Sequence, residues 1–160
     1  MGDEKTFVRL IEKIMIRWGY SHVEGKLYAM LLLSEEPLTI SQLVERTGFS
    51  RSAVSTALNR LVRDYLVEVR RRGRIKYFTA IPAFFEKFLE QPKNLLEKEV
   101  LPLEEAVKGL LSSDPPEGTK HRLKAVLAEL RLLEYSLLRL MEIEADELRK
   151  HYLTDEKPFK

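Results

Sequence analysis

Hydrophobic residues recur at intervals of three and four along most of this chain, which predicts a mainly helical protein. The first run predicts an amphipathic helix over residues 4–18, and Gly19 is placed to end it. The second run, over residues 23–34, is apolar around most of its circumference. A helix of that kind is expected to lie in a core.

The next stretch has the pattern of a helix-turn-helix. Residues 41–47 predict a short helix, and Gly48 follows where that helix must stop, because glycine enters the left-handed conformation without a steric cost. Ser50 is an expected N-cap, whose hydroxyl accepts a hydrogen bond from the first turn of the second helix. One side of that second helix is apolar at helical spacing, through Ala53, Val54, Ala57, Leu58 and Leu61.

The other side of the second helix carries small, hydrogen-bonding and cationic side chains, which suit the major groove of DNA. Arginine and asparagine there can each make two hydrogen bonds to one base, worth about 1–3 kcal/mol of discrimination. We interpret five residues of this face as candidates for contact with base edges: Arg51, Ser52, Ser55, Thr56 and Asn59. Ser50 and Arg60 are the expected phosphate contacts, Ser50 through its place at a helix N-terminus.

A two-stranded hairpin is predicted after this helix. Leu66, Val67 and Val69 belong to one strand, and Ile75, Tyr77 and Phe78 belong to the next. Gly73 is the expected turn residue. Cations at such a tip suit phosphate contacts or insertion into a minor groove. We include five of them among the DNA-binding candidates: Arg70, Arg71, Arg72, Arg74 and Lys76.

Positive charge is concentrated in this part of the chain. Residues 51–76 contain eight basic and two acidic side chains, a net charge of +6, whereas the whole chain carries +2. The remainder is therefore about −4. A basic module within an otherwise acidic chain is the electrostatic pattern of a nucleic-acid surface.

The C-terminal half predicts helices and a long apolar seam. Pro82 is placed as a first-turn residue of a helix, and Pro92 and Pro102 are expected to break or kink the following region, giving short helices rather than one rod. A loop is predicted over residues 112–118, and a long helix over residues 119–150. Its leucines and valine follow a heptad spacing, at Leu123, Val126, Leu130, Leu133, Leu137 and Leu140. Such a seam favours self-association, and an intramolecular helical bundle in a monomer is the alternative.

Composition narrows the function classes. The chain has no cysteine and only three histidines, so it offers no thiolate metal site and no convincing catalytic constellation. Glu147 and His151 are spaced to share a helix face, as His22 and Glu24 could do, but both pairs are better interpreted as exposed surface residues. No apolar run approaches the length of a membrane span. We expect a cytoplasmic protein that is not an enzyme and needs no cofactor or metal.

The order of these pieces resembles the MarR-type winged-helix regulators, and more narrowly their GbsR-like branch. The resemblance is carried by Trp18-Gly19, by residues 25–34, 37–39 and 48–55, and by residues 73–80. It implies a homodimeric transcriptional regulator, usually a repressor, that binds a pseudo-palindromic operator on double-stranded DNA. It also implies a small-molecule effector near the dimerisation helices, although no motif for one is recognisable.

The expected fold is mainly α, with a small β-hairpin wing and a winged helix-turn-helix flanked by dimerisation helices. The expected domains are an N-terminal dimerisation helix over residues 1–20, a DNA-binding domain over 21–81 and a C-terminal helical dimerisation region over 82–160. The alternative function is a winged-helix module for protein contact or for non-specific, chromatin-like DNA binding. The arginines of the wing and the polar outer helix face favour the sequence-specific regulator.

Overall fold

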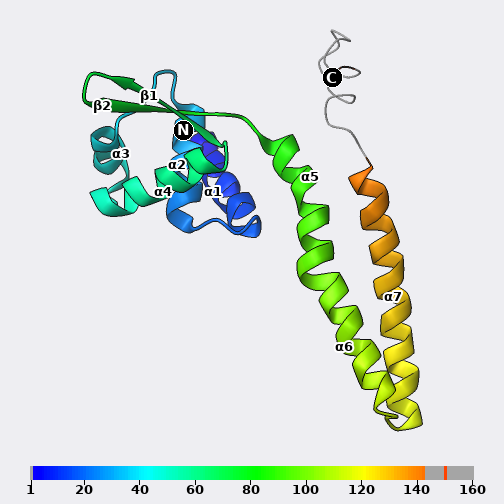
Figure 1. Cartoon of the computed structure of the whole chain (residues 1–160). Coiled ribbons are helices and arrows are strands. Elements are labelled where there is room, and N and C mark those ends of the chain that lie inside the picture. The colour runs from blue at the N-terminus through cyan, green and yellow to red at the C-terminus, as the bar shows by residue number, and fades with distance from the viewer. Residues whose placement is uncertain (1, 143–149, 151–160) are drawn as a thin grey trace. The chain divides into compact units, whose positions relative to one another are not determined.

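Figure 1 shows the computed structural model, which describes residues 2–142 and residue 150. The chain divides into two compact units, Met1–Ala83 and Phe84–Lys160. The first unit contains α1 (Gly2–Arg17), α2 (His22–Leu33), α3 (Ile40–Thr47), α4 (Arg51–Arg63), β1 (Val67–Arg72) and β2 (Ile75–Ala80). The second contains α5 (Phe84–Leu95), the π-helical turn η1 (Leu96–Val100), α6 (Leu101–Ser112) and α7 (Glu117–Met141).

Helices α1 and α2 pack closely together in the first unit. Gly25 of α2 makes this approach possible, because a Cβ atom there would lie 3.0 Å from the Cα atom of Glu12 in α1. Met15 of α1 and Leu27 and Tyr28 of α2 are fully buried. Gly19 ends α1 with a left-handed φ of 90°, as the sequence predicts.

The helix-turn-helix agrees closely with its sequence signals. Gly48 ends α3 in the left-handed conformation, with φ 74°. The Ser50 hydroxyl accepts a hydrogen bond from the Ala53 amide at 3.1 Å and so caps α4. Four of the five expected apolar residues of α4 are buried, and Ala53 is half-buried. The sequence did not reveal the start of α3, where Thr39 and Gln42 form a capping box.

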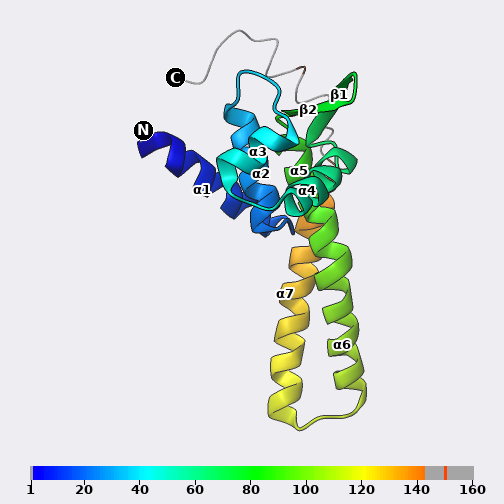
Figure 2. The same ribbon diagram turned by 90° about the vertical axis from the view of Figure 1, so that its left-hand side faces the viewer.

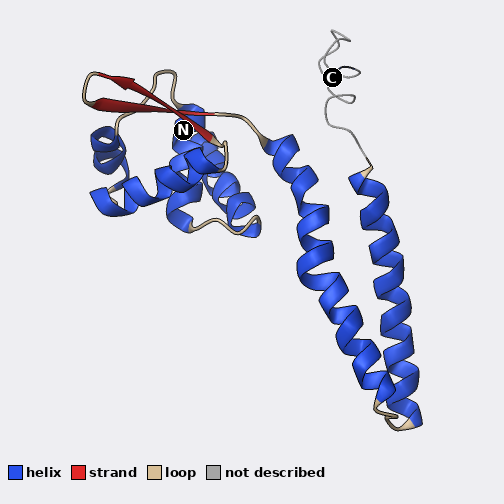
Figure 3. Cartoon of the chain, in the orientation of Figure 1, coloured by secondary structure: helices blue, strands red, loops and turns tan. Residues whose placement is uncertain are grey.

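The β-hairpin is antiparallel and pairs Arg72 with Ile75, so its turn consists of Gly73 and Arg74 (Figure 3). A contact with the segment before α3 attaches it to the helices. Phe78 exchanges both backbone hydrogen bonds with Leu38, at 3.0 and 2.8 Å, which forms a single β-bridge beside the two-stranded wing. The predicted fold class, mainly helical with a hairpin wing on a helix-turn-helix, is confirmed.

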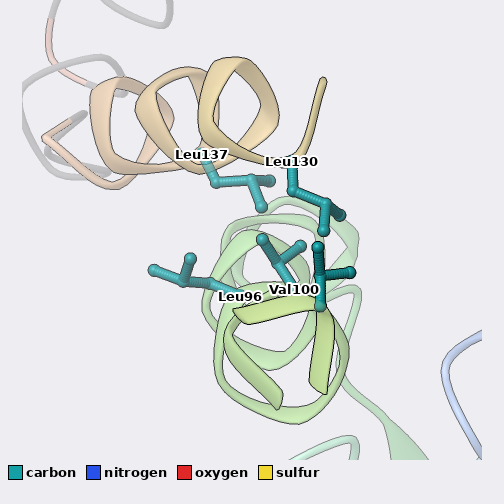
Figure 4. Close-up of a cluster of buried hydrophobic side chains, with 5 residues drawn as sticks. Leu96, Val100, Leu130 and Leu137 are labelled. Atoms are coloured by element: carbon teal, nitrogen blue, oxygen red, sulfur yellow. The ribbon is translucent and has the colours of Figure 1, made fainter. Parts of the chain in front are cut away.

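The second unit is a helical hairpin. α5, η1 and α6 follow one another without a break, and α7 returns antiparallel beside them (Figures 1 and 2). The loop between the two arms spans residues 113–116, within the predicted loop. Leu130 and Leu137 of α7 pack against Leu96 and Val100 in a buried cluster (Figure 4).

Two proline predictions for this region were wrong. Pro82 does not open a helix, because α5 begins at Phe84. The Tyr28 hydroxyl donates to the Ile81 carbonyl at 2.6 Å and accepts from the Ala83 amide at 3.4 Å, and these bonds hold the segment as a connection. Pro92 and Pro102 do not break the arm into separate helices either. Pro92 lies inside α5, and Pro102 lies in the first turn of α6, directly after the π-helical turn η1.

The heptad seam of α7 divides into two rows. Leu123, Leu130 and Leu137 turn toward the other arm of the hairpin, where they are buried or partly buried. Val126, Leu133 and Leu140 are 39–41% exposed. The hairpin therefore covers only half of the seam within the chain. The part of the predicted long helix beyond residue 142 lies outside the described residues, except for Lys150.

Candidate nucleic-acid interface

The outer face of α4 presents the predicted base-contacting side chains to solvent. Arg51, Ser52, Thr56 and Asn59 are exposed, and Ser55 is half-buried. The fold achieves this because Val54, Ala57, Leu58 and Leu61 are all buried on the opposite side. The helix therefore offers a row of hydrogen-bonding groups that its own core does not use.

Arg51 is steered by the first helix of the motif. Its Nη1 atom donates a hydrogen bond to the Ser41 hydroxyl of α3 at 3.0 Å. A guanidinium has five N–H donors, so this single bond leaves donors for a base or a phosphate. The contact also orders a long side chain that would otherwise lose rotamer freedom on binding.

The tip of the wing is cationic on both of its faces. Arg71 and Lys76 lie directly opposite each other across the strands, as a like-charged pair. Such pairs are unfavourable unless an anion lies between or near them. Arg74 belongs to the turn itself and is exposed.

On the other face of the hairpin, two arginines have neighbours within the protein. Arg70 pairs with Glu68 at 3.1 Å, and the Arg72 guanidinium lies 5.7 Å from the centre of the Tyr77 ring. Both arginines are exposed, so these contacts orient the side chains without enclosing them. A surface ion pair of this kind contributes little to stability and can exchange its partner for a phosphate.

Arg60 has a different environment from the other predicted DNA contacts. Its Nη1 atom lies 2.9 Å from Glu24 Oε2, and its Nη2 atom donates to the Gly19 carbonyl at 3.1 Å. The guanidinium also lies 4.5 Å from the centre of the Tyr20 ring. Its role as a phosphate contact stays a prediction, and the structure shows that the guanidinium is already engaged inside the first unit.

Glu24 is the residue that sequence reasoning placed wrongly. We expected it on the surface beside His22, but it is 6% exposed and faces Arg60. His22 instead pairs with Glu12 at 3.1 Å. The spacing of Ser21 and Glu24 is a capping-box pattern, and this local signal explains why the carboxylate turns back toward the chain.

Residues 2–142 and 150 contain no group of three or more histidine or acidic side chains that could hold a metal ion. Glu147 and His151, the other suggested pair, lie outside the described residues. Among the helices that the structure describes, none combines the length and hydropathy needed to cross a membrane.

Parts of this chain are similar to known proteins. Residues 26–74 match the model of the MarR family, which covers about a third of the chain. A solved structure described as the crystal structure of a transcriptional regulator is 18% identical, with a TM-score of 0.50 over 94% of this chain and 99% of that one. Reduced HlyU from Vibrio cholerae is 21% identical, covers 61% of this chain and 96% of its own, and has a TM-score of 0.38. No curated protein matches the chain.

The family match and the fold together support a MarR-type winged helix in the first unit. The family model begins in α2 and ends at the turn of the wing, so it spans the helix-turn-helix and the first strand. The narrower resemblance to the GbsR-like branch stays a prediction.

Proposed function

We propose that this chain is a sequence-specific DNA-binding transcriptional regulator that acts as a homodimer on a pseudo-palindromic site. The family match supports a DNA-binding regulator. Under this proposal α4 enters the major groove, and the wing reaches the backbone or the neighbouring minor groove. The regulator acts in the cytoplasm and is a repressor, the sign of control that the MarR resemblance implies.

The observation that carries the proposal is the division of polar groups on the first unit. The exposed row on α4 consists of groups that read bases, whereas the wing tip consists of arginines and a lysine that attract phosphates. Both belong to one compact unit. Specific recognition needs both kinds of contact, because phosphates position the protein and base edges supply the sequence information.

The dimer is supported by the exposed row of α7. Val126, Leu133 and Leu140 recur every seven residues along one line of the helix and are each about two-fifths exposed, at 39–41%. A symmetric partner would bury the same row from both chains. Two copies of α4 would then read two half-sites about one helical turn of DNA apart.

A selection experiment tests the proposal and needs no candidate operator to begin with. The protein is incubated with a pool of randomised duplexes, the bound fraction is amplified over several rounds, and the enriched sequences are footprinted. We expect an inverted repeat with two half-sites about 10 base pairs apart. A pool that stays random, bound with steep loss at higher salt, would instead support the alternative of a non-specific DNA-binding module.

A further inference from the structure

The last turn of α4 is fastened to the turn between α1 and α2 by a closed set of polar contacts. Arg60 reaches back to Glu24 and to the Gly19 carbonyl, at 2.9 and 3.1 Å. The Tyr20 hydroxyl donates to Asp64 Oδ2 at 2.7 Å, and Asp64 lies one turn after Arg60. We call the four side chains of Tyr20, Glu24, Arg60 and Asp64 the clamp.

The clamp is built around a buried carboxylate. The Glu24 side chain is 8% exposed, and its Oε2 atom accepts both from the Ser21 amide at 2.7 Å and from Arg60. A buried charge with a guanidinium and a backbone amide as partners has a strongly preferred geometry, because any shift leaves the charge unpaired away from water. The clamp therefore determines the position of the last turn of α4 relative to α2.

The planar guanidinium is held from several directions at once. Its Nη1 atom contacts Glu24 and its Nη2 atom donates to the Gly19 carbonyl, while its Cζ atom lies over the Tyr20 ring, 4.5 Å from the ring centre. Asp64 adds a longer contact to Nε at 3.9 Å. A lysine has neither the fork nor the flat face required to reproduce this arrangement.

We propose that the clamp sets the orientation of α4 on DNA and thereby determines sequence specificity, and that Arg60 is a positioning residue. This inference rests on the proposed function. Base contacts tolerate little displacement, since a bidentate hydrogen bond depends on both distance and angle. Phosphate contacts from the long, exposed wing arginines tolerate much more. A loosened α4 therefore loses discrimination before it loses affinity for DNA in general.

Glu24→Gln is the decisive variant because Glu24 is buried and lies on α2, away from the polar face of α4. Glutamine at the third position of the helix keeps the capping box, and the substitution removes only the ionic partner of Arg60. The readout is the ratio of affinities for the enriched duplex and for a scrambled duplex, measured by anisotropy. We expect this ratio to fall at least fivefold, with the salt dependence on scrambled DNA unchanged.

Arg60→Gln and the double variant complete a cycle. If both residues act through one contact, each single variant and the double variant lower the ratio by a similar factor. Arg17→Gln is the matched control, because it removes an exposed cation of the first unit that lies outside the clamp, in the last turn of α1. Arg63 is unsuitable, since its guanidinium pairs with Asp64 at 3.6 Å. We expect Arg17→Gln to leave the ratio within twofold of the unmodified protein.

Two results would overturn the inference. In the first, Arg60→Gln reduces the salt slope on both duplexes by about one while Glu24→Gln changes nothing, which identifies Arg60 as a phosphate contact. In the second, the melting temperature of Glu24→Gln falls but the affinity ratio holds, which leaves the clamp a purely stabilising role. If the unmodified protein itself fails to discriminate between the duplexes, the proposed function is wrong.

Discussion

The two units of this chain differ in how completely they bury their apolar side chains. In the first unit, most apolar residues of α2 and α4 are buried, and Tyr28, Leu58 and Leu61 are fully buried. In the second, a two-armed hairpin buries one row of α7 and leaves Leu133 and its heptad neighbours exposed. A unit that buries its own apolar side chains can be stable alone. A unit that leaves an apolar row exposed needs a second surface to cover that row, and a second copy of the same hairpin is the simplest partner.

The polar groups show the opposite contrast. In the first unit, the cations of the wing are exposed to solvent, whereas the Glu24 carboxylate is buried and paired with Arg60. The second unit contains a buried carboxylate, Glu104, whose Oε1 atom has no hydrogen-bond partner and whose Oε2 atom lies 3.8 Å from Lys108. The well-paired polar groups therefore lie in the unit that we propose to bind DNA. The exposed apolar side chains lie in the unit that we propose to form the dimer.

The largest effect is expected from breaking the exposed row of α7. In Leu133→Asp, a charge replaces an apolar side chain at the proposed interface, once in each protomer. Since burying one leucine contributes about 1.5–3 kcal/mol, two copies should weaken the dimer by about 3–6 kcal/mol. Sedimentation equilibrium should show the variant as a monomer.

The control for that variant is Tyr135→Asp, at a position 63% exposed and two residues along the same helix. Two residues correspond to about 200° of rotation, so this side chain points away from the Leu133 row. The control should dimerise normally. If Leu133→Asp dimerises with unchanged affinity, the exposed row of α7 is not the dimer interface.

A smaller effect is expected from opening a cavity in the first unit. Leu58 lies on the buried side of α4 and is fully buried, and Leu58→Ala should lower the free energy of unfolding by about 2–5 kcal/mol. The dimer, if formed by the second unit, should persist under conditions where the variant is folded. Leu33→Ala is the comparison, because Leu33 is 41% exposed and should cost less than half as much. Equal losses for the two variants would contradict the description of the core.

The third prediction separates the two kinds of DNA contact. Arg51→Ala should lose about 1–3 kcal/mol of discrimination between operator and random DNA, because it removes a base-edge contact. Arg72→Ala should weaken binding to both duplexes alike and reduce the salt slope by about one. Anisotropy titrations over a range of salt concentrations measure both quantities. If Arg51→Ala loses the same affinity for both duplexes, Arg51 is not a base-edge contact.

The smallest effect concerns a strained turn after α4. Tyr65 has a left-handed φ of 59° and is 81% exposed, at a helix end where glycine is usual. Its amide donates to the Val62 carbonyl at 3.1 Å, and the Leu66 amide donates to the Leu61 carbonyl at 2.9 Å.

Tyr65→Gly removes the steric cost of the left-handed conformation but adds conformational freedom to the unfolded chain. We therefore expect the free energy of unfolding to rise by about 0.5 kcal/mol, as measured by thermal unfolding. Tyr65→Ala keeps the strain and should not be stabilised. A marked loss on Tyr65→Gly would show that the exposed ring has a packing role.

Much of the first unit could be predicted because its signals are local. Gly48 and Ser50 end one helix and begin the next through their own backbone and hydroxyl chemistry, which adjacent residues specify. Gly73 likewise places the turn of the wing. The clamp could not be predicted in this way. Glu24 and Arg60 are 36 positions apart, and only the packing of α2 against α4 brings them together.

The second unit was harder to predict because its outcome depends on tertiary packing. Pro92 and Pro102 predicted breaks, but Pro92 lies inside α5 and Pro102 lies in the first turn of α6, directly after a π-helical turn. The heptad spacing predicted a long helix, which α7 confirms over its described residues, and self-association through its seam stays a prediction. Periodicity alone, however, does not tell which of Leu130 and Leu133 packs within the chain and which remains exposed.

The most direct test of sequence-specific recognition by a dimer is a stoichiometric anisotropy titration of the unmodified protein. It compares the enriched duplex with a scrambled duplex of equal length, at several salt concentrations. We predict saturation at two chains per enriched duplex and an affinity ratio of about 10³ or more. Equal affinities for the two duplexes, or saturation at one chain per site, would contradict the account.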